Sequence, residues 1–125
     1  MCKEHKEFTG EAHELLDRSE LEARICDAVK NEGVRRFISP MCSEAAVLAA
    51  EVVISLRETY PDLCLECAPA YEEQSSDWDE ALRDRYFAAF ELCDEERLLA
   101  TQYHTDCYAA QADYLKSRCE LCIYI

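Results

Sequence analysis

The stretch that decides the fold is Val34-Arg35-Arg36-Phe37-Ile38-Ser39-Pro40-Met41-Cys42-Ser43-Glu44. A short apolar run, Val34 to Ile38, ends in a turn that leads directly into a long apolar segment, Ala45 to Thr59. This pattern predicts a strand followed at once by a buried helix, an arrangement in which α/β folds bind a phosphate or carboxylate at the helix N-terminus. Such a loop normally needs glycines, but Pro40 removes an N–H donor and Glu44 adds a negative charge. We therefore expect the architecture of a binding fold with an altered anion site.

The rest of the chain alternates short apolar runs with segments of helical periodicity. Ser19, with Glu22 three residues later, predicts a capped helix start, and Gly33 predicts the end of that helix. Strands are expected at about residues 4–9, 35–39, 63–68, 97–101 and 121–125, and helices at about residues 19–33, 43–59, 79–93 and 106–118. This alternation predicts one α/β domain, residues 1–125, with a mainly parallel five-stranded sheet and helices on both faces.

Composition excludes several classes of function. Half of the 125 residues are hydrophobic and 32% are charged, which is typical of a globular domain. Thirteen basic against 27 acidic residues give a net charge of -14, which disfavours binding to nucleic acid or to an anionic membrane. The longest apolar stretch, Ala45 to Leu56, is interrupted by Glu51, so no membrane span is predicted. The N-terminus lacks an apolar signal region, and we expect a cytoplasmic protein.

Nine cysteines are present, and their odd number without a secretory signal predicts reduced thiols, most of them buried. Two C-x-x-C pairs, Cys64/Cys67 and Cys119/Cys122, resemble zinc or redox motifs. Residues three apart on a strand point to opposite faces, so the first pair is not expected to chelate one ion. The second pair is less constrained. We expect no metal and no cofactor. We also expect no catalytic residues, because no nucleophile with a partnered base has the spacing of a catalytic motif.

A series of short motifs carries a resemblance to a known family. In sequence order, the motifs are Phe8-Thr9-Gly10, Phe37-Ile38-Ser39, Ala49-Ala50-Glu51, Tyr60-Pro61-Asp62, Tyr71-Glu72-Glu73-Gln74 with Trp78, Arg85-Tyr86, and Cys107-Tyr108 with Tyr114. Over nearly its whole length the chain resembles the DUF1273/YpsA-like family of the SLOG (SMF/DprA–LOG) superfamily. The resemblance implies a three-layer Rossmann-like sandwich whose strand tips bind a nucleotide or a nucleotide-derived ligand.

The chain departs from the family pattern at positions that face the ligand. We therefore expect a truncated member with altered ligand-site motifs, because the chain stops at Ile125 where the family continues with a glycine-rich stretch. Glu11-Ala12-His13 stands in place of His-Arg-Pro. Pro40, Glu44 and Ala46 lie in a segment that glycines bracket in the family. Ala70 stands in place of proline, and Gln111-Ala112 in place of Arg-Asn.

Nine residues are the candidate ligand-binding set. A tyrosine and a tryptophan near a strand tip could stack on a base, and Glu72 could accept hydrogen bonds from a ribose or a base amine. Structural roles remain open for several of these residues: a strand-end turn for Gly10, a helix cap for Ser43 and core packing for Trp78. The full set is Thr9, Gly10, Ser39, Ser43, Tyr71, Glu72, Gln74, Trp78 and Tyr108.

These observations favour a non-catalytic binding or sensory domain for a nucleotide derivative, with a degenerate pocket that binds ordinary nucleotides weakly or not at all. One alternative is a structural or interaction domain without a small ligand, forming a homodimer that covers the apolar strand at residues 121–125. The least favoured alternative is a LOG-like nucleotide hydrolase, because the loop and acidic residue of those enzymes have no counterpart here.

Overall fold

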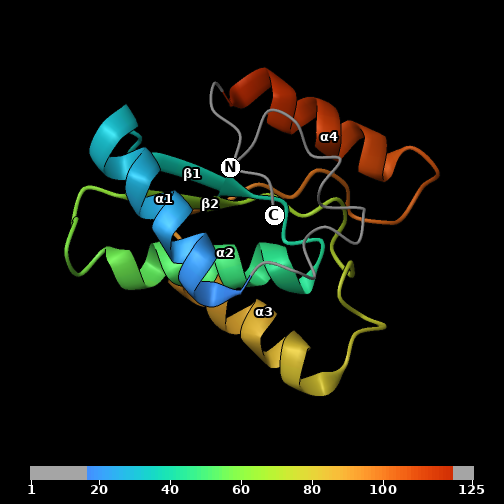
Figure 1. The fold of residues 1–125 in the computed structure, drawn as a ribbon. Helices are drawn as coiled ribbons and strands as arrows, with labels where there is room; N and C mark the ends of the chain where they lie inside the picture. The colour runs from blue at the N-terminus through green and yellow to red at the C-terminus, as the bar shows by residue number, and fades with distance from the viewer. Residues whose placement is uncertain (1–16, 120–125) are drawn as a thin grey trace.

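The computed structural model describes residues 17–119 (Figure 1). The strands expected at residues 4–9 and 121–125, together with Thr9 and Gly10, lie outside the described residues. In chain order the elements are α1 (Arg18–Glu32), β1 (Arg36–Ser39), α2 (Glu44–Leu56), β2 (Cys64–Cys67), α3 (Glu80–Leu92), β3 (Glu95–Glu96) and α4 (Cys107–Arg118).

The described elements form three layers around a parallel sheet of order β1-β2-β3. Helices α1, α2 and α3 lie on one face of the sheet, and α4 lies on the other (Figure 1). The predicted three-layer α/β class is therefore confirmed. The predicted number of strands is wrong for the described residues, where the sheet has three strands rather than five.

The strand expected at residues 97–101 is replaced by the two-residue β3, Glu95–Glu96. The backbone continues beside β2 for a few residues, because the N–H of Arg97 donates to the carbonyl of Cys67 at 2.8 Å. The next step of a parallel ladder would need an N–H from residue 69 to the carbonyl of Arg97. Residue 69 is proline, which has no N–H, so the regular ladder ends there.

Helix boundaries follow local capping chemistry. The N-cap of α1 is Asp17, whose carboxylate accepts from the N–H of Glu20 at 2.9 Å, so the predicted cap at Ser19 is wrong by two residues. Asp17 is as good a cap as serine, and Ser19 is absorbed into the first turn. The predicted stop at Gly33 is confirmed, because this residue adopts φ 71° and donates its N–H to the carbonyl of Ala28.

Helix α2 is the centre of the larger core, as its nearly continuous apolar sequence predicted. Its residues from Ala45 to Val53 pack between α1, α3 and the sheet, and most are fully buried. Phe37 and Leu65 contribute the sheet's side of this core. No helix within residues 17–119 has both the length and the apolar character needed to cross a membrane.

The seven cysteines between residues 17 and 119 are all free thiols. Cys67 packs in the larger core, while Cys64 lies beside the Arg36 guanidinium at 3.4 Å, so the two side chains point to opposite faces as predicted. Only Cys67 and Cys107 are buried, and the other five are partly exposed. The expectation that most cysteines would be buried is therefore wrong, because several lie at the ends of elements or on helix flanks.

Candidate functional site

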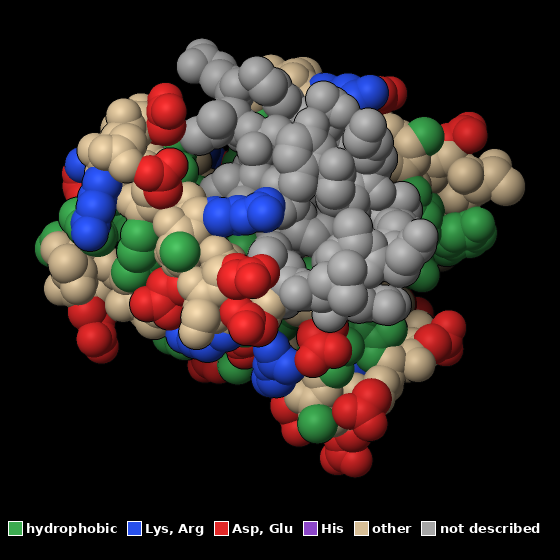
Figure 2. Space-filling view, in the orientation of Figure 1, with side chains coloured by type: hydrophobic (Ala, Val, Ile, Leu, Met, Phe, Trp, Pro, Cys, Tyr) green, Lys and Arg blue, Asp and Glu red, His purple; other side chains and the backbone are tan. Residues whose placement is uncertain are grey.

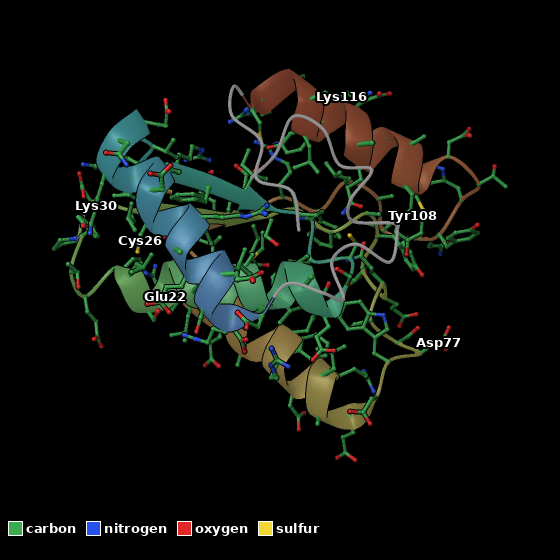
Figure 3. The ribbon with its side chains drawn as sticks, in the orientation of Figure 1. Glu22, Cys26, Lys30, Asp77, Tyr108 and Lys116 are labelled. Atoms are coloured by element: carbon green, nitrogen blue, oxygen red, sulfur yellow. The ribbon has the colours of Figure 1, made fainter. Side chains whose placement is uncertain are left out.

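The carboxyl ends of the parallel strands meet at one edge of the sheet, where ligands bind in open α/β folds. The loops after β1 and β2 and the start of α4 gather at this edge. Figure 3 shows Tyr108 and Asp77 at this end of the molecule and Lys30 at the opposite end. Seven of the nine predicted site residues lie between residues 39 and 108, within or next to these loops.

The loop after β1 uses its own hydroxyl groups internally. Ser39 is fully buried, and its Oγ donates to the carbonyl of Ala46 at 2.9 Å and accepts from the N–H of Met41 at 3.2 Å. Ser43 caps α2 by accepting from the N–H of Ala46 at 3.2 Å. Met41 has φ 56°, the left-handed region where glycine is usual, and its side chain is fully buried. These two serines are therefore engaged in holding the loop.

Two buried glutamines fasten the loops to one another. The Gln74 amide donates to the carbonyls of Met41 at 2.6 Å and Pro40 at 3.2 Å, and its oxygen accepts from the N–H of Ala70 at 2.8 Å. The Gln111 amide donates to the carbonyl of Pro40 at 2.8 Å and also to that of residue 68. Gln74, a predicted ligand residue, thus satisfies buried backbone groups in this structure. The role of Gln111 could not be read from sequence.

One arginine binds two carboxylates of α2, that of Glu44 at its N-terminus and that of Glu51 two turns later. Arg85 from α3 donates to Glu51 through Nε at 3.1 Å and through Nη2 at 2.8 Å, and to Glu44 at 3.3 Å. The hydrogen bonds to Glu51 are the main cause that raises the pKa of Arg85. The Glu44 side chain remains 71% exposed. A phosphate at this helix end would meet Glu44, which offsets the attraction of the helix dipole.

Three tyrosines form an exposed aromatic cluster at the same edge. Tyr71 makes edge-to-face contacts with Tyr103 at 5.5 Å and with Tyr108 at 6.1 Å between ring centroids. Tyr103 is 61% exposed and Tyr108 is 46% exposed. Burial, and then a hydrogen bond with Tyr71, raises the pKa of Tyr108 well above its ordinary value. Of these rings, Tyr103 was missed, because it belongs to no motif and lies in an irregular segment.

Trp78 packs against the larger core. Its ring meets Tyr86 edge to face at 5.3 Å. Of the two interpretations of this residue, the structure favours packing over base stacking.

A pocket of about 240 Å³ opens between α3 and the ends of β2 and β3. Three aromatic side chains of α3 form one wall, and Glu72 and Glu96 contribute carboxylates. Glu72 is the only predicted site residue in the lining; Leu98 was expected in the strand at residues 97–101, and Glu96 was assigned to no element. The complete lining is Pro69, Glu72, Tyr86, Phe87, Phe90, Glu96 and Leu98.

On the other face of the sheet, a polar cluster lies beneath α4. Glu66 is fully buried, and it accepts from Arg36 at 2.6 Å and from the Tyr114 hydroxyl. Arg36 also pairs with Glu95 from β3, and these carboxylates raise its pKa. The Tyr114 ring lies 5.8 Å from the guanidinium of Arg97. Every charged group in this cluster has a partner, so it joins β1, β2, β3 and α4.

The part of the chain that the structure describes contains no cluster of metal-binding side chains. No group of three or more His, Cys, Asp or Glu side chains between residues 17 and 119 could hold an ion. His104 lies in the turn before α4, where its Nδ1 accepts from the N–H of Asp106 at 3.3 Å.

A parallel sheet between helical layers, with loops gathered at the carboxyl edge, defines a Rossmann-like α/β domain. The model of the YpsA family, described as the YspA SLOG family, matches residues 15–125. The chain belongs to this family, which confirms the resemblance found in its motifs.

Two curated relatives are similar to parts of the chain. The UPF0398 protein BH1768 of Halalkalibacterium halodurans is 37% identical over 67 residues, which cover 54% of this chain and 35% of that protein. The UPF0398 protein ABC2016 of Shouchella clausii is 43% identical over 47 residues, covering 37% of this chain and 25% of that protein. The matched segments thus span about a third or less of the length of these relatives.

Proposed function

We propose that this domain is a non-catalytic binding module, which takes the ring of a small nucleotide-derived molecule at its carboxyl edge without recognising phosphate. The observation that carries the proposal is the contrast between the two halves of that edge. The pocket beside α3 is open, whereas the loop after β1 has its polar groups engaged by Ser39, Ser43 and Gln74.

The size of the pocket supports a ring-sized ligand. An engineered apolar cavity of about 150 Å³ holds benzene, and pockets for drug-sized ligands span roughly 300–1,000 Å³. At about 240 Å³, the pocket lies between these two sizes. It has room for one base or a similar ring, while the remainder of a nucleotide would extend over the tyrosine cluster or into solvent.

The charges near the edge support the lack of phosphate recognition. Glu44 stands at the N-terminus of α2, Glu72 and Glu96 line the pocket, and the chain carries a net charge of -14. A phosphate would be repelled by each of these carboxylates without a basic group in the pocket lining to offset them.

Calorimetry with adenosine, ATP and ADP-ribose tests the proposal. We expect the nucleotides to bind no more tightly than the nucleoside, and the variant Phe90→Ala to weaken nucleoside binding. The control Leu92→Ala removes an exposed side chain of the same helix that does not line the pocket. Micromolar binding of ATP or ADP-ribose, with the nucleoside much weaker, would contradict the proposal.

The second candidate is an interaction domain, favoured by exposed apolar side chains along α3 and after β3. Phe87 is 53% exposed, Leu92 is 52% exposed and Leu98 is 44% exposed. A homodimer that buries these side chains should dissociate in the variant Leu92→Glu, which leaves the pocket lining unchanged. Sedimentation at tens of micromolar measures this, and a monomeric parent chain would remove the candidate.

A further inference from the structure

We propose that the pocket between α3 and the ends of β2 and β3 selects a small organic cation over a neutral molecule of the same shape. This inference rests on the proposed function in one respect, namely that the pocket is a ligand site. It goes beyond the proposed function in ligand class, because a positive charge on the ligand, which adenosine lacks, is what strengthens binding in this pocket.

The first argument is the placement of two carboxylates. Glu72 comes from the loop after β2, and Glu96 comes from β3, so two separate segments bring negative charge to one cavity. Neither carboxylate pairs with a Lys or Arg between residues 17 and 119, in contrast to Glu44, Glu51, Glu66 and Glu95. The lining contains no Lys, Arg or His. Among residues 17–119, neither carboxylate is therefore neutralised by an ion pair.

The second argument is the aromatic wall. Tyr86, Phe87 and Phe90 line the pocket from α3, and the rings of Phe87 and Phe90 are centred 5.2 and 4.8 Å from the ring of Tyr86. The faces of such rings attract cations, most strongly where water is displaced. The protein already uses this interaction here, because the guanidinium of Arg83 lies 5.9 Å from the centre of the Phe87 ring. Arg83 is not part of the lining.

The third argument is the electrostatic field that the net charge of the whole chain produces. With 27 acidic and 13 basic residues, the net charge of -14 raises the local concentration of cations and lowers that of anions. Figure 2 shows acidic side chains over much of the visible surface that is not grey. Long-range attraction thus acts in the same direction as the two carboxylates and the rings of the pocket.

The test compares choline with its neutral isostere, in which a tert-butyl group replaces the trimethylammonium group. We expect choline to bind at least about tenfold more tightly in NMR titrations, since cation–π contacts and carboxylates act together. The double variant Glu72→Gln/Glu96→Gln should bring the two affinities within about twofold of each other. The variant Glu91→Gln is the matched control, because Glu91 is an exposed carboxylate of α3 outside the lining.

The outcomes separate this inference from the proposed function. Equal binding of choline and its isostere, or binding of adenosine without choline, would overturn the cation selectivity and leave a ligand site in place. Binding of choline without any nucleoside would support the inference and refute the nucleotide-derived ligand. If Glu91→Gln reduced the preference for choline over its isostere as much as the double variant does, the inference would be overturned. The effect would then come from the net charge alone.

Discussion

The variant Gln74→Ala separates a structural role of this residue from a role in ligand binding. The side chain is 5% exposed and connects three backbone groups in two loops. Truncation leaves the N–H of Ala70 and the carbonyl of Met41 without their partner. The carbonyl of Pro40 keeps its bond from Gln111 at 2.8 Å.

The magnitude follows from these two buried groups. Each buried donor or acceptor left unsatisfied costs about 1–3 kcal/mol. For two such groups we expect the free energy of unfolding to fall by about 3 kcal/mol, and the melting temperature to fall by roughly 10 °C. Exposed Gln102 provides the control, and Gln102→Ala should change stability by no more than about 0.5 kcal/mol.

Urea unfolding followed by tryptophan fluorescence measures both variants, because Trp78 packs in the core and is the only tryptophan of the chain. A loss below about 1 kcal/mol in Gln74→Ala would refute the reasoning that underlies the predicted magnitude. If the variant kept the stability of the parent chain but lost a bound ligand, the original interpretation of Gln74 as a ligand residue would be restored.

Three further predictions test the local chemistry of the fold. Gly33→Ala should lower the free energy of unfolding by about 1 kcal/mol in thermal denaturation, because φ 71° strains a residue with a Cβ although no atom lies within 4 Å of it; an unchanged stability would contradict this. Ser43→Ala should cost about 1 kcal/mol through loss of the α2 cap, whereas Ser76→Ala, at an exposed loop position, should be neutral. Cys42 is partly exposed but packs against the larger core, and desolvation there raises its pKa to about 12. Its alkylation at pH 8 should therefore be much slower in the folded than in the unfolded chain, and equal rates by mass spectrometry would contradict this.

Sequence reasoning succeeded where the determining chemistry is local. The cap at Ser43, the stop at Gly33 and the buried character of α2 all follow from a few neighbouring residues. The start of α1 was misplaced because Asp17 and Ser19 are both good caps, and sequence alone does not choose between them.

Contacts between residues far apart in the sequence could not be predicted from local patterns. Gln111 meets the carbonyl of Pro40 across 71 positions of sequence, and Glu66 meets Arg36 across 30. Neither partner has a local pattern that requires the other. The pocket was missed for a related reason, since Glu96 and Leu98 become pocket residues only through the path of the chain beside α3.

Pro69 connects the shortened sheet with the pocket. It lies two residues beyond β2, at the position where a longer ladder would need an N–H for the carbonyl of Arg97. Without that bond, the chain after β3 does not continue as a regular strand, and the N–H of Leu99 reaches the carbonyl of Pro69 only at 3.4 Å. Pro69 and Leu98 then stand at the pocket as lining residues. At the end of β1, by contrast, the Gln74 side chain is hydrogen-bonded to backbone groups of Pro40, Met41 and Ala70, so these loops are held to one another.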